Sequence, residues 1–392
     1  MRPSKTFRAA GAASALVLSL SACAAMLDRL ESRGAVVATD AECPGLVATT
    51  TPWAMSTDPE HFAVPAVPPS LDRRVAVWKR IWGRLSARQH LVVDSDRPWL
   101  VWAEVDCRGV ADSVCDDRLA AGRAEAASSR FASVDDDLLA AFDGNADLAE
   151  SAQERVITIH GRRGDLKQAM RRASGELYEI EGLFAAAGVP RAFARVALLE
   201  SGWQDEGVSA KGATGIFQFT TATAHDLLQV DDDVDERRDH RRTAAAAAVY
   251  LKQLHDRFGS WPLALTAYNT GPTRLQAVLQ ARQTRDLGVA ADAGDLAGFG
   301  FEGQNYFAQV TAIAAVTADE VLAIEVHGGR AMQLGEPLSV MALSSCLGVD
   351  PAQLAAANPA WAEAVVGGER DVPAGHVVWV PGVDGSTRLV TR

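Results

Sequence analysis

Residues 196–203 read VALLESGW, an apolar run of helical character that ends in a single acidic residue, Glu200. A carboxylic acid acts as a general acid only if its pKa lies near the working pH, which requires an apolar and partly desolvated site. The four apolar residues before Glu200, and Trp203 after it, supply such a setting. A solvated helix end is the alternative, although the macrodipole disfavours negative charge at a helix C-terminus. Glu200 is therefore a candidate acid/base, and both interpretations stay open at this point.

Short helical patterns lie on both sides of this run, at residues 166–184, 191–200, 220–227, 243–258, 260–268 and 307–322. In each of them apolar residues recur at the spacing of a helix with one buried face. Gly188 and Gly259 can adopt the left-handed conformation that ends a helix, and Thr220 and Ser260 can cap the helices that follow. Several short helices joined by short loops predict a compact, mainly α domain.

Three further segments combine glycine, amide and aromatic residues. Residues 211–219, KGATGIFQF, form a glycine-punctuated loop that allows backbone to approach a ligand and presents one amide, Gln218. Residues 267–271, AYNTG, place an aromatic ring beside an amide, and residues 304–307, QNYF, add a second tyrosine. Amides that lose water need hydrogen-bonding partners, which sugar hydroxyl and acetamido groups supply. Each segment alone is more often a plain turn, but together they indicate a sugar-binding cleft.

In this order the motifs resemble the family 1 lytic transglycosylases, whose soluble-lytic-transglycosylase-like (SLT) domain has a goose-type lysozyme fold, and most closely their membrane-bound type D branch. The resemblance covers roughly residues 157–321 and rests on ES (200–201), GIFQF (215–219), DERRD (235–239), WPLAL (261–265), AYN (267–269) and NY (305–306). Thr270 stands where the family usually has a small alanine, and Phe217 where it often has Met or Trp. These departures concern substrate fit more than chemistry.

The resemblance implies a lysozyme-like catalytic domain that acts on peptidoglycan without a cofactor. It implies that Glu200 is the catalytic acid/base and that Ser201 and Tyr306 hold its carboxyl group. The residues it places at the sugar subsites are Gly215, Ile216, Phe217, Gln218, Tyr268 and Asn269.

The motifs offer one carboxylate, whereas retaining and inverting glycosidases normally use two. This favours non-hydrolytic cleavage of the MurNAc–GlcNAc bond, in which the C6 hydroxyl of the substrate attacks C1 and gives a 1,6-anhydro product. Asp205 is the nearest spare carboxylate, and as a base toward water it would make the protein a lysozyme-type muramidase. A non-catalytic peptidoglycan-binding scaffold of the cell envelope is the third alternative.

The first residues have the pattern of an export signal. Basic residues precede a short apolar run, and small residues lead to Cys23, as in a lipobox. We therefore expect residues 1–22 to be a signal peptide, Cys23 to be lipidated and, with Ala24 next to it, the protein to face the periplasm from the outer membrane. Residues 23–70 are rich in proline and small residues, which predicts a flexible tether.

Residues 71–155 are predicted to be a helical region with an insertion of unknown role. Residues 71–88 form a basic amphipathic pattern that either binds anionic lipid or glycan or docks on the acidic body. Cys107 and Cys115 are close enough for a disulfide in an oxidising compartment, and the eight histidines show no paired metal spacing, so no metal is expected. The net charge of −12 argues against nucleic acid as a partner, and a monomer is expected.

The catalytic domain is predicted to span residues 156–325. Residues 327–383 then read as two short helices and a strand, a pattern that resembles a LysM glycan-binding repeat. The opening strand of this repeat is degenerate at residues 330–334, RAMQL. The segment is therefore either a glycan-binding module or a packed structural appendage.

Overall fold

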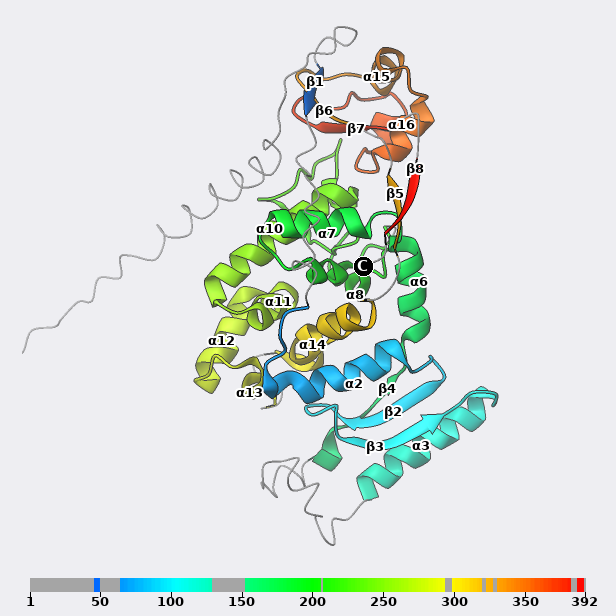
Figure 1. Ribbon diagram of the computed structural model, residues 1–392, viewed down its shortest axis with the longest axis vertical. Helices are drawn as coiled ribbons and strands as arrows, with labels where there is room; N and C mark the ends of the chain where they lie inside the picture. Colours follow the sequence, from blue (N-terminus) through cyan, green and yellow to red (C-terminus); the bar gives the residue numbers. More distant parts are fainter. Residues whose placement is uncertain are drawn as a thin grey trace, which may run out of the picture.

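The computed structural model describes residues 46–49, 64–128, 152–205, 207–292, 298–318, 322–326, 330–381 and 386–390. The predicted signal segment and Cys23 lie outside the described residues. Figure 1 shows a helical body with a small sheet at each end of the long axis. The prediction of a mainly α protein is confirmed.

The helical body is built around one apolar core that contains the buried faces of nearly all its helices. Its elements are α6 (Arg163–Ala173), α7 (Leu177–Ala186), η4 (Arg191–Arg195), α8 (Val196–Glu200), α9 (Thr221–Ala224), η5 (Glu236–Arg238), α10 (His240–Phe258), α11 (Trp261–Thr270), α12 (Pro272–Arg282), α13 (Leu287–Ala291) and α14 (Gly300–Val316). The alanines at 244–248 of α10 are all buried, and they let this helix pack closely against α7 and α11. Asp239 caps α10 at its start, and Gly259, in the left-handed conformation, ends it.

The helix predicted over residues 166–184 is two helices in the structure. The break lies at Ser174, Gly175 and Glu176, between α6 and α7. Serine is a weak helix former, and glycine pays the largest backbone entropy cost, so the apolar spacing on both sides could not carry one helix through this point.

The basic helix α2 (Asp72–Gly83) docks on α14, which decides between its two sequence interpretations. Val75, Trp78, Ile81 and Trp82 are buried against the body. Arg74 is buried too and donates hydrogen bonds to Asn305 Oδ1 (2.9 Å), Asp96 O (2.6 Å) and Asp292 Oδ1 (2.7 Å). The apolar face of α2 is therefore not available to a membrane.

The region between α2 and α6 contains a sheet that the sequence interpretation as a helical region did not include. Strands β2 (Gln89–Asp94), β3 (Val101–Asp106) and β4 (Val156–His160) pair antiparallel in the order β3-β2-β4, and α3 (Asp112–Ser128) packs on them. Because β4 pairs with β2, the predicted domain boundary at residues 155 and 156 divides a single sheet. Cys107 and Cys115 form a disulfide that joins the end of β3 to α3.

The C-terminal module contains β6 (Arg330–Leu334), α15 (Val340–Leu347), α16 (Pro351–Ala357), α17 (Glu363–Val366) and β7 (Val377–Val380). Its third strand is β1 (Leu46–Thr49), which pairs with β6 and places Leu46 in the core of the module. This corrects the prediction of a flexible tether over residues 23–70 for the part at β1, where an apolar strand completes a sheet edge. Strands β5 (Leu322–Val326) and β8 (Ser386–Val390) form a separate pair.

No single helix among the described residues is long and apolar enough to cross a membrane. The bent pair α15 and α16 passes the same test of length and composition only when its two helices are taken together.

Candidate functional site

Glu200 is the last residue of α8, a short helix whose other residues pack into the body. The chain reverses directly after it, because Gly202 and Trp203 both adopt the left-handed conformation (φ 61° each). The backbone N–H groups of Ser201 and Trp203 both donate to the carbonyl of Ala197, which closes the end of the helix. The reversal leaves the Glu200 side chain facing a pocket rather than bulk solvent.

The pocket beside Glu200 has a volume of about 550 Å³. Three predicted site residues line it, Glu200, Ser201 and Gln218, together with Arg172 and the stretch that follows the chain reversal. We call this stretch, residues 201–205 and 207–209, the pocket wall.

The carboxyl group of Glu200 is held by Tyr306 from α14, whose hydroxyl donates to Glu200 Oε1 at 2.5 Å. Burial raises the pKa of Glu200 to about 7, the hydrogen bond from Tyr306 opposes this rise, and the nearby charge of Glu302 adds to it. A carboxyl group with this pKa can give up a proton and take one back at neutral pH.

Folding raises the pKa of Glu200 from its ordinary value of 4.5, so the ionised form of this side chain destabilises the folded state at high pH. A carboxyl group whose pKa is raised by folding contributes stability that is present below about pH 4.5 and lost as the pH rises through about 7. The gap between these values corresponds to about 3 kcal/mol. Glu200→Gln cannot ionise, so we expect it to be more stable than the wild type by up to that amount at pH 8, and equally stable near pH 4.5. Denaturant unfolding at both pH values measures this, and an advantage independent of pH would contradict it.

The Ser201 hydroxyl makes its hydrogen bonds to backbone groups rather than to the Glu200 carboxyl group, contrary to what the family resemblance implied. The hydroxyl lies 3.2 Å from the carbonyl of Ala197 and 3.1 Å from the carbonyl of Ile216, and it accepts from the backbone N–H of Gln204. The Ser201 hydroxyl has one proton, and these two backbone carbonyls are the acceptors for it. Ser201 therefore ties α8 to the loop at residues 215–219.

Ile216 and Phe217 are core residues rather than ligand contacts. Both side chains are 0% exposed, and the ring of Phe217 stacks on Phe184 with the ring centroids 5.7 Å apart. Gly215 (φ 74°) is needed for packing, because a Cβ there would lie 1.7 Å from the carbonyl oxygen of Arg237. The glycine permits a close approach between two backbone segments, which a sequence cannot distinguish from a close approach to a ligand.

Gln218 is the residue of this loop that reaches the pocket. Its backbone is left-handed (φ 51°), and its side-chain Nε2 donates to the carbonyls of Gly207 (3.3 Å) and Gly215 (3.0 Å). The amide therefore links the glycine loop to the pocket wall.

Tyr268 lies behind Glu200 in an aromatic cluster, and its ring stacks with that of Tyr306 at 6.5 Å. Its hydroxyl donates to the carbonyl of Phe217 at 2.7 Å, and burial raises its pKa well above the ordinary value. Asn269 is exposed near the end of α11. Neither residue is among those that line the pocket, so the structure does not bring them to it as it does Gln218.

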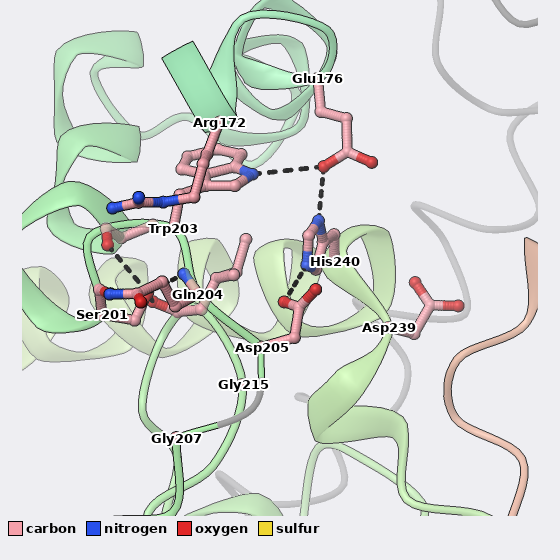
Figure 2. A network of polar contacts seen from close by, with 12 residues as sticks. Arg172, Glu176, Ser201, Trp203, Gln204, Asp205, Gly207, Gly215, Asp239 and His240 are labelled. Carbon is pink, nitrogen blue, oxygen red and sulfur yellow. Dashed lines mark hydrogen bonds and ion pairs between the residues drawn. The ribbon is translucent and has the colours of Figure 1, made fainter. Parts of the chain in front are cut away.

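Asp205, the spare carboxylate, lines the pocket and is paired with His240. The imidazole of His240 lies between two carboxylates, with Nε2 on Asp205 and Nδ1 on Glu176, as Figure 2 shows. Burial alone would lower the pKa of His240, but these two partners raise it to about 10. Glu176 and His240 were not predicted from the sequence as site residues, because 64 residues separate them and no motif joins them.

The described residues contain one group of His, Cys, Asp or Glu side chains with the spacing of metal ligands. His90, Cys107 and Cys115 lie close enough together, but the two sulfur atoms are bonded to each other. A disulfide offers no thiolate to a metal, so this cluster does not have the chemistry of a zinc site.

Comparison with known proteins places all the described lining residues of the pocket except Arg172 in a recognised sequence region. Residues 184–287 match the family model described as "Transglycosylase SLT domain". Two relatives from Escherichia coli strains K12 and O6:H1, both named "Membrane-bound lytic murein transglycosylase D", are 28% identical over 116 residues, or 29% of this chain and 26% of each relative. A "Putative tributyltin chloride resistance protein" from Alteromonas sp. (strain M-1) is 33% identical over 106 residues, or 26% of this chain and 51% of the relative. The chain thus spans between a quarter and about half of the length of these curated relatives.

Proposed function

We propose that this chain, which carries an SLT-type transglycosylase domain, is a lytic transglycosylase that cleaves the glycan strands of peptidoglycan. The observation that carries the proposal is Glu200 itself. It faces a pocket, its pKa is raised to about 7, and it accepts a hydrogen bond from a buried tyrosine. These are the properties of a group that acts as an acid and then as a base.

In the proposed reaction Glu200 first donates its proton to the glycosidic oxygen, and the bond from that oxygen to C1 of the muramic acid breaks. The acetamido group of the same sugar stabilises the positive charge at C1. The Glu200 carboxylate then takes the proton of the C6 hydroxyl while that oxygen bonds to C1. A 1,6-anhydro sugar forms, and no water is consumed.

The pairing of Asp205 supports this route over hydrolysis. A second carboxylate would have to be free to activate water or attack C1. Asp205 is instead bound to His240, whose raised pKa keeps it positively charged at neutral pH. Because Asp205 Oδ1 is occupied by this bond, we assign both proton transfers to Glu200.

The products of digestion test the proposal. Purified protein is incubated with sacculi, and the released muropeptides are weighed by mass spectrometry. We expect 1,6-anhydro ends, each lighter by one water than the product of hydrolysis. Reducing ends would instead identify a muramidase, and binding to sacculi without any release would identify a scaffold.

The dependence of activity on pH follows from the pKa of Glu200. Since the protonated form is the reactive one, kcat/KM should fall as the pH rises above about 7. Tyr306→Phe removes a hydrogen bond that favours the carboxylate, so this fall should move to higher pH while the rate at pH 6 drops about tenfold. Tyr250→Phe, which removes a hydroxyl from the same aromatic cluster without contacting Glu200, is the control and should leave the profile in place. An unmoved profile in the Tyr306 variant would contradict the role of this bond.

The cellular location is proposed on the sequence alone. We propose that residues 1–22 direct export and that lipidated Cys23 holds the protein on the outer membrane, facing the periplasm. The substrate lies in the same compartment, and the C-terminal module, which packs against the start of α10, is then a second point of contact with glycan.

A further inference from the structure

The pocket wall has little regular structure of its own, so other elements must hold its shape. Arg172 Nε donates to the carbonyl of Gly202 (2.8 Å), and Gln218 Nε2 donates to the carbonyl of Gly207 (3.3 Å). Between these two points the pocket wall is held through the side chains of Trp203 and Asp205, and both side chains contact His240.

His240 and Glu176 form the centre of this attachment. Glu176 Oε2 accepts from Trp203 Nε1 (3.3 Å) and from His240 Nδ1, and His240 Nε2 bonds Asp205. The ring of Trp203 meets the imidazole edge-on at 6.1 Å. The side chain of His240 is 15% exposed, so these contacts are made largely away from water, where charge-assisted bonds are strong.

The first turn of α10, which carries His240, is itself fixed by the C-terminal module. One oxygen of Asp239 caps the turn by accepting from the N–H groups of Arg241 and Arg242. Its other oxygen accepts from Trp379 Nε1 of β7 at 2.8 Å, and the guanidinium of Arg241 lies over the Trp379 ring at 4.7 Å.

The segment just before this turn also belongs to the module. Val234 is part of its apolar core and pairs with Trp361, and the backbone N–H of Asp235 donates to the carbonyl of Ala360. The C-terminal module is therefore packed onto the helical body at the residues that directly precede His240 in the chain.

We propose that His240 is a positioning residue that sets the shape of the sugar-binding pocket, and that Trp379 of the C-terminal module keeps it in place through Asp239. This rests on the proposed function, since it assigns the pocket to glycan. Among its described contacts His240 touches neither Glu200 nor Tyr306. Its loss should therefore weaken substrate binding and leave the proton transfers intact.

The test compares His240→Asn with the wild type on soluble, uncrosslinked peptidoglycan strands. Asparagine cannot bond both carboxylates, so we expect KM to rise about tenfold while kcat stays within about threefold. Asp205→Ala, in a side chain that is 46% exposed, removes the acceptor for His240 Nε2, so it breaks the same link with less risk to folding and should raise KM similarly. The double variant should be no worse than either single one, because all three break one link.

Two further variants complete the test. His225→Asn breaks a matched histidine–aspartate pair on the surface, with Asp226, and should change neither constant. Trp379→Phe keeps the ring over Arg241 but removes the N–H, and should raise KM about threefold.

A purely structural role would lower kcat through the active fraction and leave KM unchanged, and that result would overturn the inference. An unchanged KM in Asp205→Ala would do the same. If the wild type releases no product, the proposed function fails instead, so the two failures are distinguishable.

Discussion

Glu200→Gln is expected to lose at least about 10³-fold in kcat, because glutamine can neither give up nor take back the proton that both steps require. The change is isosteric, and its amide oxygen can still accept from Tyr306. Binding should therefore survive. The release of anhydro products measures the loss, and titration of soluble strands against the variant measures the binding that remains.

Glu302→Gln is the matched control for this variant. It removes an exposed carboxylate whose charge raises the pKa of Glu200, without removing the acid itself. Its activity at pH 6 should stay within about threefold, and the fall at high pH should move to slightly lower pH. Retained turnover in Glu200→Gln would overturn the catalytic assignment, and loss of turnover in both variants would show that local charge matters rather than one proton.

Gly215→Ala is expected to cost about 4 kcal/mol or more of folding stability. The new Cβ would lie 1.7 Å from the carbonyl oxygen of Arg237, and alanine is also strained at the φ of 74°. The Arg237 backbone cannot easily yield, because its guanidinium is tied to Asp235 (2.8 Å) and to the carbonyl of Gly212 (3.0 Å). Denaturant unfolding measures the cost.

Gly212→Ala provides a control with the same backbone conformation. Its φ is also 74°, but a Cβ there would have no neighbour within 4 Å. We expect it to cost only about 1 kcal/mol, the strain of the left-handed conformation alone. Equal losses in the two variants would show that backbone strain, rather than the contact with Arg237, fixes the glycine.

Local sequence was enough to predict the mainly α fold and the setting of Glu200, because both depend on neighbouring residues. The apolar run before Glu200 is buried in the core, and the carboxyl group at its end is desolvated as well. The family resemblance added Tyr306, which lies 106 residues away and does bond to Glu200. No local pattern contained that contact.

The errors arise at contacts that motif spacing does not encode, either with residues distant in the chain or with backbone groups. Gly215 indicated a ligand, but the atom beside it is the carbonyl of Arg237. Ser201 was expected at the carboxyl group and instead bonds backbone. No sequence motif contains both Glu176 and His240, because their contact forms only when α7 and α10 pack together. Such pairings depend on tertiary structure and cannot be derived from spacing.

The strand β1 places residues from near both ends of the chain in one sheet, with Leu46 opposite Leu334. During synthesis this strand is made early, and its partner emerges only after the whole helical body. The domain order along the chain is therefore not the folding order, since the C-terminal sheet cannot be completed until β6 exists. Until then, the strand bearing Leu46 has unpaired backbone groups and can pair with another chain. A C-terminal truncation should therefore promote aggregation through a segment at the opposite end of the sequence.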